Sequence, residues 1–286
     1  MEIEVTRDVE RFAALADGFL AARSERNLLA TITEVVRTAG PMPSWGDPWF
    51  GVGLDPGTRQ VVAAALRTPP RHLLATGFNS AAAADQLIAT WLEVDPELSG
   101  IGAIRGEAAL LVQAWTRLTG GKAALQMSEA LHELDMVVAP PDPPDGYLRS
   151  AVFADLGLIA TWFAQFTIEA GLGDPDAAAE SARRAIEAGR SYVWDDGGPV
   201  MMLGHAPRVA GVTRVGPVYT PPEFRRRGYA SAAVAALSQK LLDDGARRCI
   251  LYTDLANPTS NKIYAALGYR RFAEWEEHAF LTNSGV

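Results

Sequence analysis

The residues best suited to chemistry lie in one short basic turn, Arg225-Arg226-Arg227-Gly228-Tyr229-Ala230. Its glycine lets the backbone come close to a ligand. At the start of a helix, unpaired N–H groups and the positive end of the dipole favour an anion. Three arginines add positive charge at the same place. The turn therefore predicts an anion-binding site that suits a group such as pyrophosphate.

The sequence on either side predicts the elements that position this turn. β-branched and aromatic residues from Val212 to Tyr219 favour a strand, and Pro221-Pro222 must end it at about Thr220, because proline lacks the N–H that a ladder needs. Apolar residues recur at helical spacing from Ser231 to Leu242, and Gly245 is placed to end that helix. The turn thus joins the end of a strand to the start of a helix.

A second motif follows a strand predicted at Ile250 to Thr253. From Asn257 to Tyr269 it reads Asn-x-x-Ser-x-x-x-Tyr-x-x-x-Gly-Tyr, with Ser260 and Tyr264 at the inner positions. Such a short pattern is informative only in its structural context. Here both motifs fall on predicted strand-turn-helix units and follow one another along the chain.

Together the two motifs resemble the GNAT (GCN5-related) N-acetyltransferase superfamily. The turn is similar to its acyl-CoA pyrophosphate loop, Arg/Gln-x-x-Gly-x-Gly/Ala, with Arg225, Gly228 and Ala230 on the defining positions. The second motif is similar to the family's Asn-x-x-Ala-x-x-x-Tyr-x-x-x-Gly-Phe/Tyr, with Ser260 in place of the commoner alanine. A Rossmann-like unit with an unrelated basic turn is the alternative.

The resemblance implies a site for acetyl-CoA as co-substrate. The end of the strand would offer backbone groups to the pantetheine arm, and the turn would hold the pyrophosphate. For Arg226 a solvated surface position is an equal alternative. The residues that the resemblance assigns to the cofactor are Val218, Tyr219, Thr220, Arg225, Arg226, Arg227, Gly228, Tyr229, Ala230, Ser231, Asn257, Ser260 and Asn261.

The resemblance also implies direct transfer of the acyl group from the thioester to a primary amine. The amine must lose a proton and the departing thiolate gains one. Tyr264 matches the family's acid, and its alternative is a tyrosine that only packs on its helix. For the base we nominate Asp254, whose alternative is capping or turn formation. Asn257 begins the same helix, so it suits a cap, a pantetheine contact or both.

Two function classes remain open at this point. One is an acyl-CoA-dependent N-acyltransferase, and the other is a non-catalytic acyl-CoA-binding or regulatory protein of the same fold. The acceptor amine, the acyl chain and the oligomeric state are not specified by the sequence. Thiol release from acetyl-CoA with a panel of amines separates the two classes.

Composition narrows the remaining possibilities. The formal net charge of -8 argues against a nucleic-acid-binding surface as the main function. Cys249 is the single cysteine, which excludes an intrachain disulfide, and the four histidines share no ligand spacing, so no metal is expected. The longest apolar stretch, Leu156 to Ile168, is shorter than the roughly 20 residues that span a bilayer. We expect a cytoplasmic protein.

The order of predicted elements occurs twice in the chain. We expect α/β (α+β) tandem GNAT-like folds with mixed, mostly antiparallel sheets flanked by helices. Residues 1–138 would form a degenerate domain, because its turn, Phe78 to Ala83, has neither glycine nor a basic residue. The proline-rich segment Ala139 to Gly146 would be the linker, and residues 147–286 the acetyltransferase domain. An unrelated α/β domain is the alternative for the first half.

Each half should end on paired short strands. Two weak strands are expected between Lys122 and Val138, and two final strands at Tyr269 to Glu276 and His278 to Leu281. Asp55-Pro56-Gly57 is a hairpin-type turn signal, so its neighbouring strands should be antiparallel.

Overall fold

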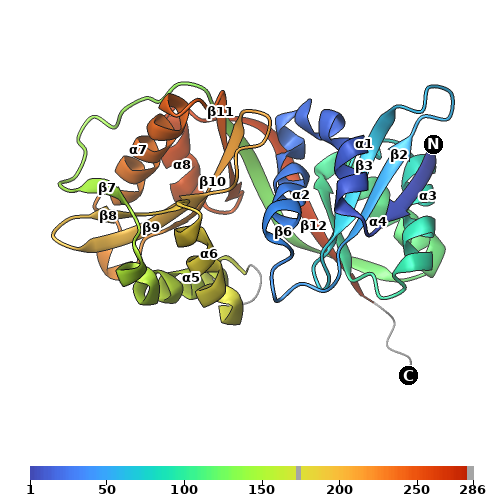
Figure 1. Ribbon diagram of the computed structural model, residues 1–286, viewed down its shortest axis with the longest axis horizontal. Coiled ribbons are helices and arrows are strands. Elements are labelled where there is room, and N and C mark those ends of the chain that lie inside the picture. The colour runs from blue at the N-terminus through green and yellow to red at the C-terminus, as the bar shows by residue number, and fades with distance from the viewer. Residues whose placement is uncertain (172–174, 282–286) are drawn as a thin grey trace. The chain divides into compact units, whose positions relative to one another are not determined.

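The computed structural model describes residues 1–171 and 175–281 (Figure 1). The chain divides into two compact units. Unit 1 comprises Met1–Leu131 together with the last residues of the chain from Ala273, and unit 2 comprises His132–Phe272.

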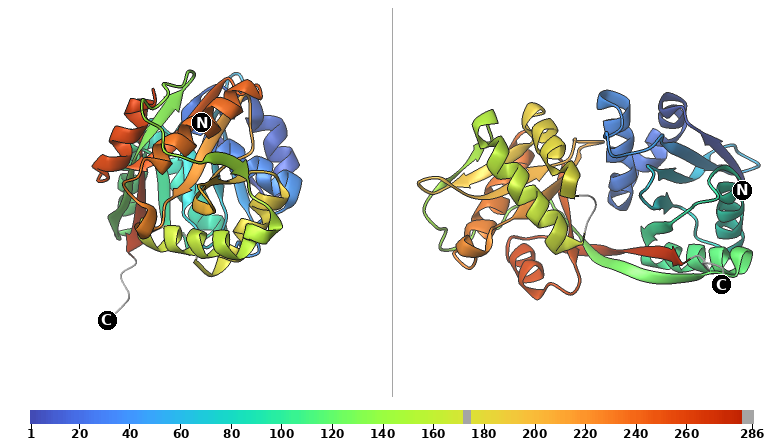
Figure 2. Two further views of the ribbon diagram at one scale, coloured as in Figure 1. Left: turned by 90° about the vertical axis from the view of Figure 1, so that its left-hand side faces the viewer. Right: turned by 90° about the horizontal axis from the view of Figure 1, so that it is seen from below.

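Unit 1 is a sheet with helices on both faces. Figure 2 shows the first two helices on one side of the strands and the next two on the other, where they cover a buried core. The sheet order is β1-β2-β3-β4-β5-β12-β6, in which β6 spans Lys122–Leu134 and β12 spans Arg270–Leu281. The strands are β1 (Glu2–Thr6), β2 (Trp49–Leu54), β3 (Val61–Arg67), β4 (Leu73–Thr76) and β5 (Gly100–Ile104). The helices are α1 (Val9–Ala21), α2 (Asn27–Ala39), α3 (Ala81–Val94) and α4 (Arg105–Thr119).

Unit 2 repeats this order of elements, and its strands run β6-β11-β10-β9-β8-β7 across the sheet. The strands are β7 (Tyr147–Ser150), β8 (Ser191–Asp195), β9 (Pro199–His205), β10 (Val212–Tyr219) and β11 (Arg248–Asp254). The helices are α5 (Leu156–Ala170), α6 (Ala178–Glu187), α7 (Tyr229–Asp243) and α8 (Pro258–Ala266). Among the registered pairings, β4–β5 and β10–β11 are parallel and the others are antiparallel. The predicted fold class is confirmed.

Two long strands replace the paired short strands expected at the end of each half. β6 runs unbroken over Lys122–Leu134 and β12 over Arg270–Leu281. The prediction of two strands at each place is wrong, because neither stretch contains a glycine or proline that would break the ladder. The far end of β12 pairs antiparallel with β5, where Trp275 faces Ile104.

The compact units also divide at places other than the proline-rich segment. The divisions fall within β6, after Leu131, and within β12, after Phe272. Residues 139–146 contain no helix or strand and belong to unit 2, where Trp194 Nε1 donates a hydrogen bond to the carbonyl of Asp145 at 3.0 Å. That the two halves are repeats joined by this segment stays a prediction.

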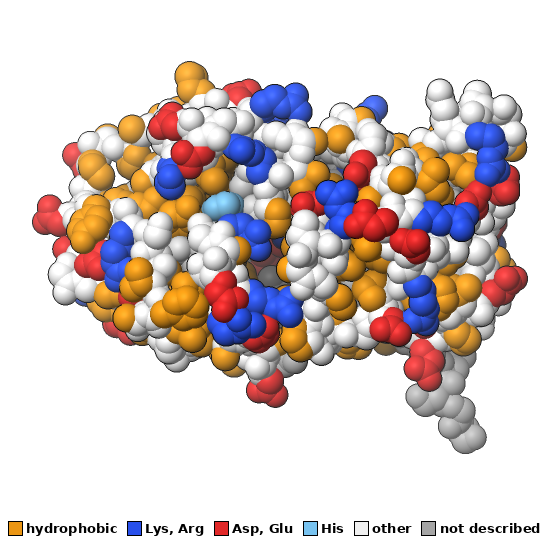
Figure 3. Space-filling model, viewed as in Figure 1, with side chains coloured by type: hydrophobic (Ala, Val, Ile, Leu, Met, Phe, Trp, Pro, Cys, Tyr) orange, Lys and Arg blue, Asp and Glu red, His pale blue; other side chains and the backbone are white. Residues whose placement is uncertain are grey.

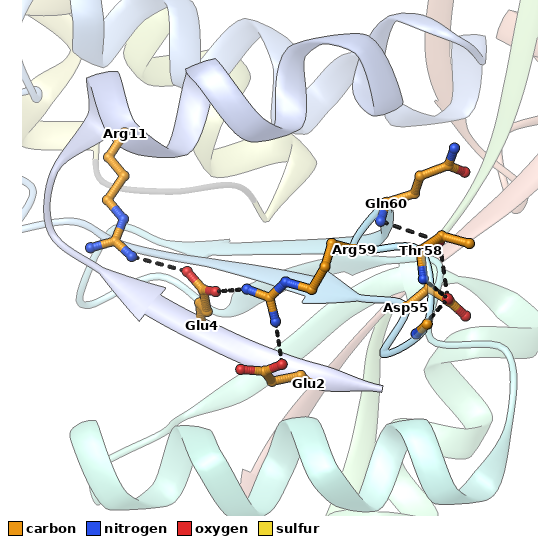
Figure 4. A network of polar contacts seen from close by, with 8 residues as sticks. Glu2, Glu4, Arg11, Asp55, Thr58, Arg59 and Gln60 are labelled. Atoms are coloured by element: carbon orange, nitrogen blue, oxygen red, sulfur yellow. Dashed lines mark hydrogen bonds and ion pairs between the residues drawn. The ribbon is translucent and has the colours of Figure 1, made fainter.

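The hairpin signal at Asp55 is confirmed, since β2 and β3 pair antiparallel around it. Asp55 Oδ1 accepts hydrogen bonds from the N–H groups of Gly57 and Thr58 (Figure 4). The same turn presents Arg59, which forms ion pairs with Glu2 and Glu4 of β1. The pKa of Glu4 is held below its usual value by the hydrogen bond from Arg59, which is the largest cause, and by a second one from Arg11. These ion pairs connect the edge strand β1 to the hairpin between β2 and β3.

In unit 2 the strand period of two separates the cores on the two faces of the sheet. Along β8, Tyr192 and Trp194 pack with α7 and α8, whereas Val193 packs with α5 and α6. Met201 and Met202 alternate in the same way on β9. Figure 1 shows α7 and α8 on one side of these strands and α5 and α6 on the other.

Candidate functional site

The candidate site begins where β10 and β11 cease to pair. These parallel neighbours are in register over Val212–Arg214 and Arg248–Ile250. Farther along, Val218 and Tyr219 pair with β9 on the opposite edge, and no register between the later residues of β10 and β11 is found in the described chain. Backbone groups at the end of β10 therefore stand outside that ladder, as the addition of an extended ligand requires.

The basic turn connects this strand end to α7, as predicted. Gly228 occupies the N-cap position with φ +83°, a conformation that glycine adopts without strain. α7 begins at Tyr229, so the N–H groups of its first residues lack partners within the helix. Arg226 is also left-handed, at φ +62°, which is uncommon for a residue with a side chain. The turn has the backbone geometry of an anion site.

The resemblance predicts that Arg225 contacts the pyrophosphate, but in this structure its guanidinium contacts a carboxylate of the protein. Its Nη2 is 2.7 and 2.9 Å from the two carboxylate oxygens of Glu169, on α5. Its Nε donates to the carbonyl of Thr220 at 2.8 Å, and its guanidinium lies 5.6 Å from the ring centroid of Tyr219. The side chain is folded back over the end of β10.

Tyr219 belongs to the same group of contacts. Its hydroxyl donates to Glu169 Oε1 at 2.9 Å and lies 3.3 Å from Gln165 Oε1. Burial, followed by the adjacent carboxylate of Glu169, raises the pKa of Tyr219. Its buried ring packs with α5 and α6, and the half-buried Val218 packs with the core on the opposite face.

The other turn residues are divided between solvent and core. Arg226 and Arg227 are exposed, and the Arg227 guanidinium lies 5.8 Å from the Phe224 ring centroid. Tyr229 is buried, and its hydroxyl donates to Asp196 Oδ2 at 2.5 Å, which holds the pKa of Tyr229 above its usual value. Two half-buried residues then continue the first turn of α7: Ala230 and Ser231.

The second motif forms a capped helix. Asn257 is the N-cap of α8, and its Oδ1 accepts a hydrogen bond from the N–H of Ser260 at 3.1 Å. Asn261 Nδ2 donates to the carbonyls of Asp254 and Asn257. The exposed carboxylate of Asp254 accepts from the N–H of Ala256 at 2.8 Å. The predicted cap by Asn257 is confirmed. The contact of Asp254 is typical of turn formation, the role named as the alternative to that of general base.

Tyr264 lies on the buried side of α8. Its ring meets that of Tyr269 edge to face, with centroids 6.0 Å apart, in the core beneath α7. Burial raises the pKa of Tyr264 to about 12, so its hydroxyl is protonated at neutral pH. The structure thus gathers the site residues into two groups, one around Arg225 and Tyr219 and one around α8. No hydrogen bond joins the turn to the α8 cap within the described residues.

Glu169 and Asp196 were missed by sequence reasoning. Glu169 lies 56 positions before Arg225, and Asp196 lies 33 positions before Tyr229. No local spacing signals either contact, because both depend on which helix or hairpin folds against the turn.

Unit 1 differs at the corresponding strand end. β4 and β5 are registered as a parallel pair at Leu73 and Leu74. Just past β4, the N–H of Gly77 donates to Glu107 Oε2 at 2.9 Å, so a carboxylate from α4 bonds the backbone there. Glu107 is the third residue of α4, as Ser260 is of α8. Glu107 thus places a long, acidic side chain at the helix position where unit 2 has the short side chain of Ser260.

No helix among the described residues is long and apolar enough to cross a membrane. No group of three or more His, Cys, Asp or Glu residues is arranged for a metal ion in those residues. Figure 3 shows acidic and basic side chains interspersed on the face in view.

Comparisons with known proteins agree with this architecture. Residues 199–278, which include both motifs, match the family model described as FR47-like protein. No curated protein matches the sequence.

Several solved structures align with nearly the whole chain, among them the following three. An acetyltransferase of the GNAT family from Colwellia psychrerythraea is 13% identical, with a TM-score of 0.62 over 98% of this chain and 100% of the other. A Drosophila protein is 14% identical, with a TM-score of 0.69 and 99% of each chain covered. A tandem GNAT protein from the clavulanic acid biosynthesis pathway is 13% identical, with a TM-score of 0.62 over 97% and 98%. The chain has the fold of the GNAT acetyltransferases, and its residues 199–278 match the FR47-like domain.

Proposed function

We propose that unit 2 binds acyl-CoA, with acetyl-CoA as the expected donor, and transfers the acyl group to a primary amine. The observation that carries this proposal is the position of the turn. Gly228 opens α7 shortly after the end of β10, whose last residues are not in register with β11. An anion site and an unpaired strand end are therefore adjacent, which suits a ligand with a pyrophosphate and an amide-containing arm.

Each part of the site then has a role in binding. The backbone of Val218, Tyr219 and Thr220 pairs with the pantetheine arm, and the N–H groups at the start of α7 hold the pyrophosphate. Arg226 and Arg227 add positive charge from the solvent side. The cap residues Asn257, Ser260 and Asn261 border the arm from α8.

In the transfer, the deprotonated amine attacks the thioester carbonyl carbon, a C–N bond forms and the C–S bond breaks. The departing sulfur gains a proton. Tyr264 is the proposed donor, because its position in the second motif matches the family's acid and its hydroxyl carries a proton at neutral pH. Asp254 remains the nominee for the group that receives the amine proton, and its exposure leaves it open to solvent.

The proposal assigns one site to the chain, in unit 2. In unit 1, α3 begins with Ser80, whose hydroxyl accepts from the N–H of Ala83, so the chain supplies its own cap there. The Glu107 carboxylate adds negative charge at the strand end, which opposes an anionic ligand.

The experiment is thiol release from acetyl-CoA in the presence of a panel of primary amines, with cofactor binding measured in parallel. Binding together with amine-dependent release supports the transferase. Binding without release for any amine supports the non-catalytic acyl-CoA-binding protein. Absence of binding contradicts both.

A further inference from the structure

Glu169, on α5, contacts both the end of β10 and the basic turn of the candidate cofactor site. Its carboxylate receives two contacts from Arg225 and one from the Tyr219 hydroxyl. Within the described residues, Arg225 is the one arginine of the turn that forms an ion pair; Arg226 and Arg227 form none there. The first arginine of the turn is thus neutralised by the protein itself.

The Arg225–Glu169 ion pair is exposed enough for Arg225 to exchange the carboxylate for another anion. The side chains of Arg225 and Glu169 are 42% and 47% exposed, and exposed pairs contribute little to stability. Arginine binds phosphate oxygens with the same planar fork that it offers to a carboxylate. A pyrophosphate at the start of α7 therefore competes with Glu169 for one guanidinium.

We propose that Glu169 is a positioning residue that holds Arg225 away from the anion site until acyl-CoA binds. This inference rests on the proposed function of unit 2. When the pyrophosphate binds, Arg225 exchanges Glu169 for phosphate oxygens, and the Tyr219 hydroxyl remains hydrogen-bonded to the carboxylate. Breaking the resident pair lowers the affinity for acyl-CoA. Glu169 thereby sets the concentration at which the site fills.

The test is calorimetric titration of acetyl-CoA into four proteins: the wild type, Glu169→Gln, Arg225→Gln and the double variant. Glutamine keeps the size of Glu169 and removes its charge, so Arg225 is released. We expect Glu169→Gln to bind about two- to fivefold more tightly, the range that loss of an exposed pair allows. Arg225→Gln should bind more weakly than the wild type, and the double variant should match Arg225→Gln.

The matched control is Glu223→Gln, which removes an equally negative side chain from the loop that leads into the turn. Glu223 is exposed and forms no ion pair in the described structure. Its loss measures the long-range effect of one charge on an anionic ligand. Thermal unfolding of every variant checks that the fold is retained. A conservative Glu169→Asp keeps the charge and should bind acetyl-CoA with an affinity between those of the wild type and Glu169→Gln.

Four results would overturn the inference: no tightening in Glu169→Gln, a change no larger than that of Glu223→Gln, the same tightening in the Arg225→Gln background, or an unaltered Kd in Arg225→Gln. A wild type that binds no acetyl-CoA would instead contradict the proposed function. Binding by the wild type with an unaltered Kd in Arg225→Gln would leave that function standing and remove Arg225 from the exchange.

Discussion

Pro144 lies against Gly228, with its Cδ 3.4 Å from the point where a Cβ on that glycine would stand. The proline-rich segment therefore covers part of the turn that opens α7. Gly228 suits this position because its φ of +83° disfavours a side chain, whereas a Cβ there would meet Pro144 only at ordinary van der Waals distance. One flank of the anion site is formed by a segment that sequence analysis treats as a linker.

Replacement of Gly228 by aspartate should abolish acetyl-CoA binding, because a carboxylate would stand at the pyrophosphate position. The matched control is Gly228→Asn, which has the same size, tolerates a positive φ and carries no charge. Calorimetry should show a much larger loss of affinity for aspartate than for asparagine. Equal losses would mean that strain in the backbone, rather than repulsion of an anion, explains the effect.

Tyr264→Phe removes one hydroxyl and keeps the ring that packs edge to face on Tyr269. If the hydroxyl protonates the departing thiolate, the transfer rate should fall roughly 10²- to 10⁴-fold while acetyl-CoA affinity stays nearly constant. Single-turnover kinetics with an amine found by screening measure this. A variant that keeps the full rate shows that Tyr264 only packs, and Ser260 and Tyr219 are then the hydroxyls to test.

Alkaline pH should destabilise the protein through its buried tyrosines. Burial raises the pKa of Tyr264 from 10.0 to about 12, and it raises that of Tyr269 as well. The folded state then binds more protons than the unfolded state above the unfolded pKa. Stability is complete below about pH 10 and is lost as the pH rises toward 12.

Denaturation midpoints measured from about pH 9 to about pH 11 should therefore decline, and less steeply in Tyr264→Phe. The variant lacks one of the groups whose ionisation is linked to unfolding. An identical decline in both proteins would show that the Tyr264 hydroxyl titrates normally in the folded state.

Cys249 should resist thiol reagents in the folded protein. It is fully buried on β11, its Sγ lies 3.8 Å from the carbonyl of Ser238, and burial raises the pKa of its thiol to about 12. Because the thiolate is the reactive form, labelling must wait for unfolding. Labelling followed against denaturant should coincide with the unfolding transition, and rapid labelling without denaturant would contradict this burial.

The local units of the site could be predicted from the sequence because each is specified by neighbouring residues. Pro221-Pro222 ends β10, Gly228 opens α7 and Asn257 caps α8, as the turn and capping preferences require. The hairpin at Asp55 was predictable for the same reason. These elements need no knowledge of what packs against them.

The remaining features depend on contacts between distant parts of the chain. Arg225 was expected to face a phosphate, and its partner Glu169 comes from a helix whose placement no spacing reveals. β12 was expected as two strands within the second half, whereas its last residues pair with β5 of unit 1. Strand partners and ion pairs of this kind are settled by tertiary packing rather than by local propensity.

The central claim is that the chain has one acyl-CoA site, in unit 2, at the start of α7. Calorimetric titration of acetyl-CoA into the full chain tests it most directly, with crosslinking or a crystal structure to locate the ligand. We predict one molecule bound per chain, beside Gly228 and the end of β10. Two equivalent sites, a ligand at Ser80 to Ala83 in unit 1, or no binding would contradict the claim.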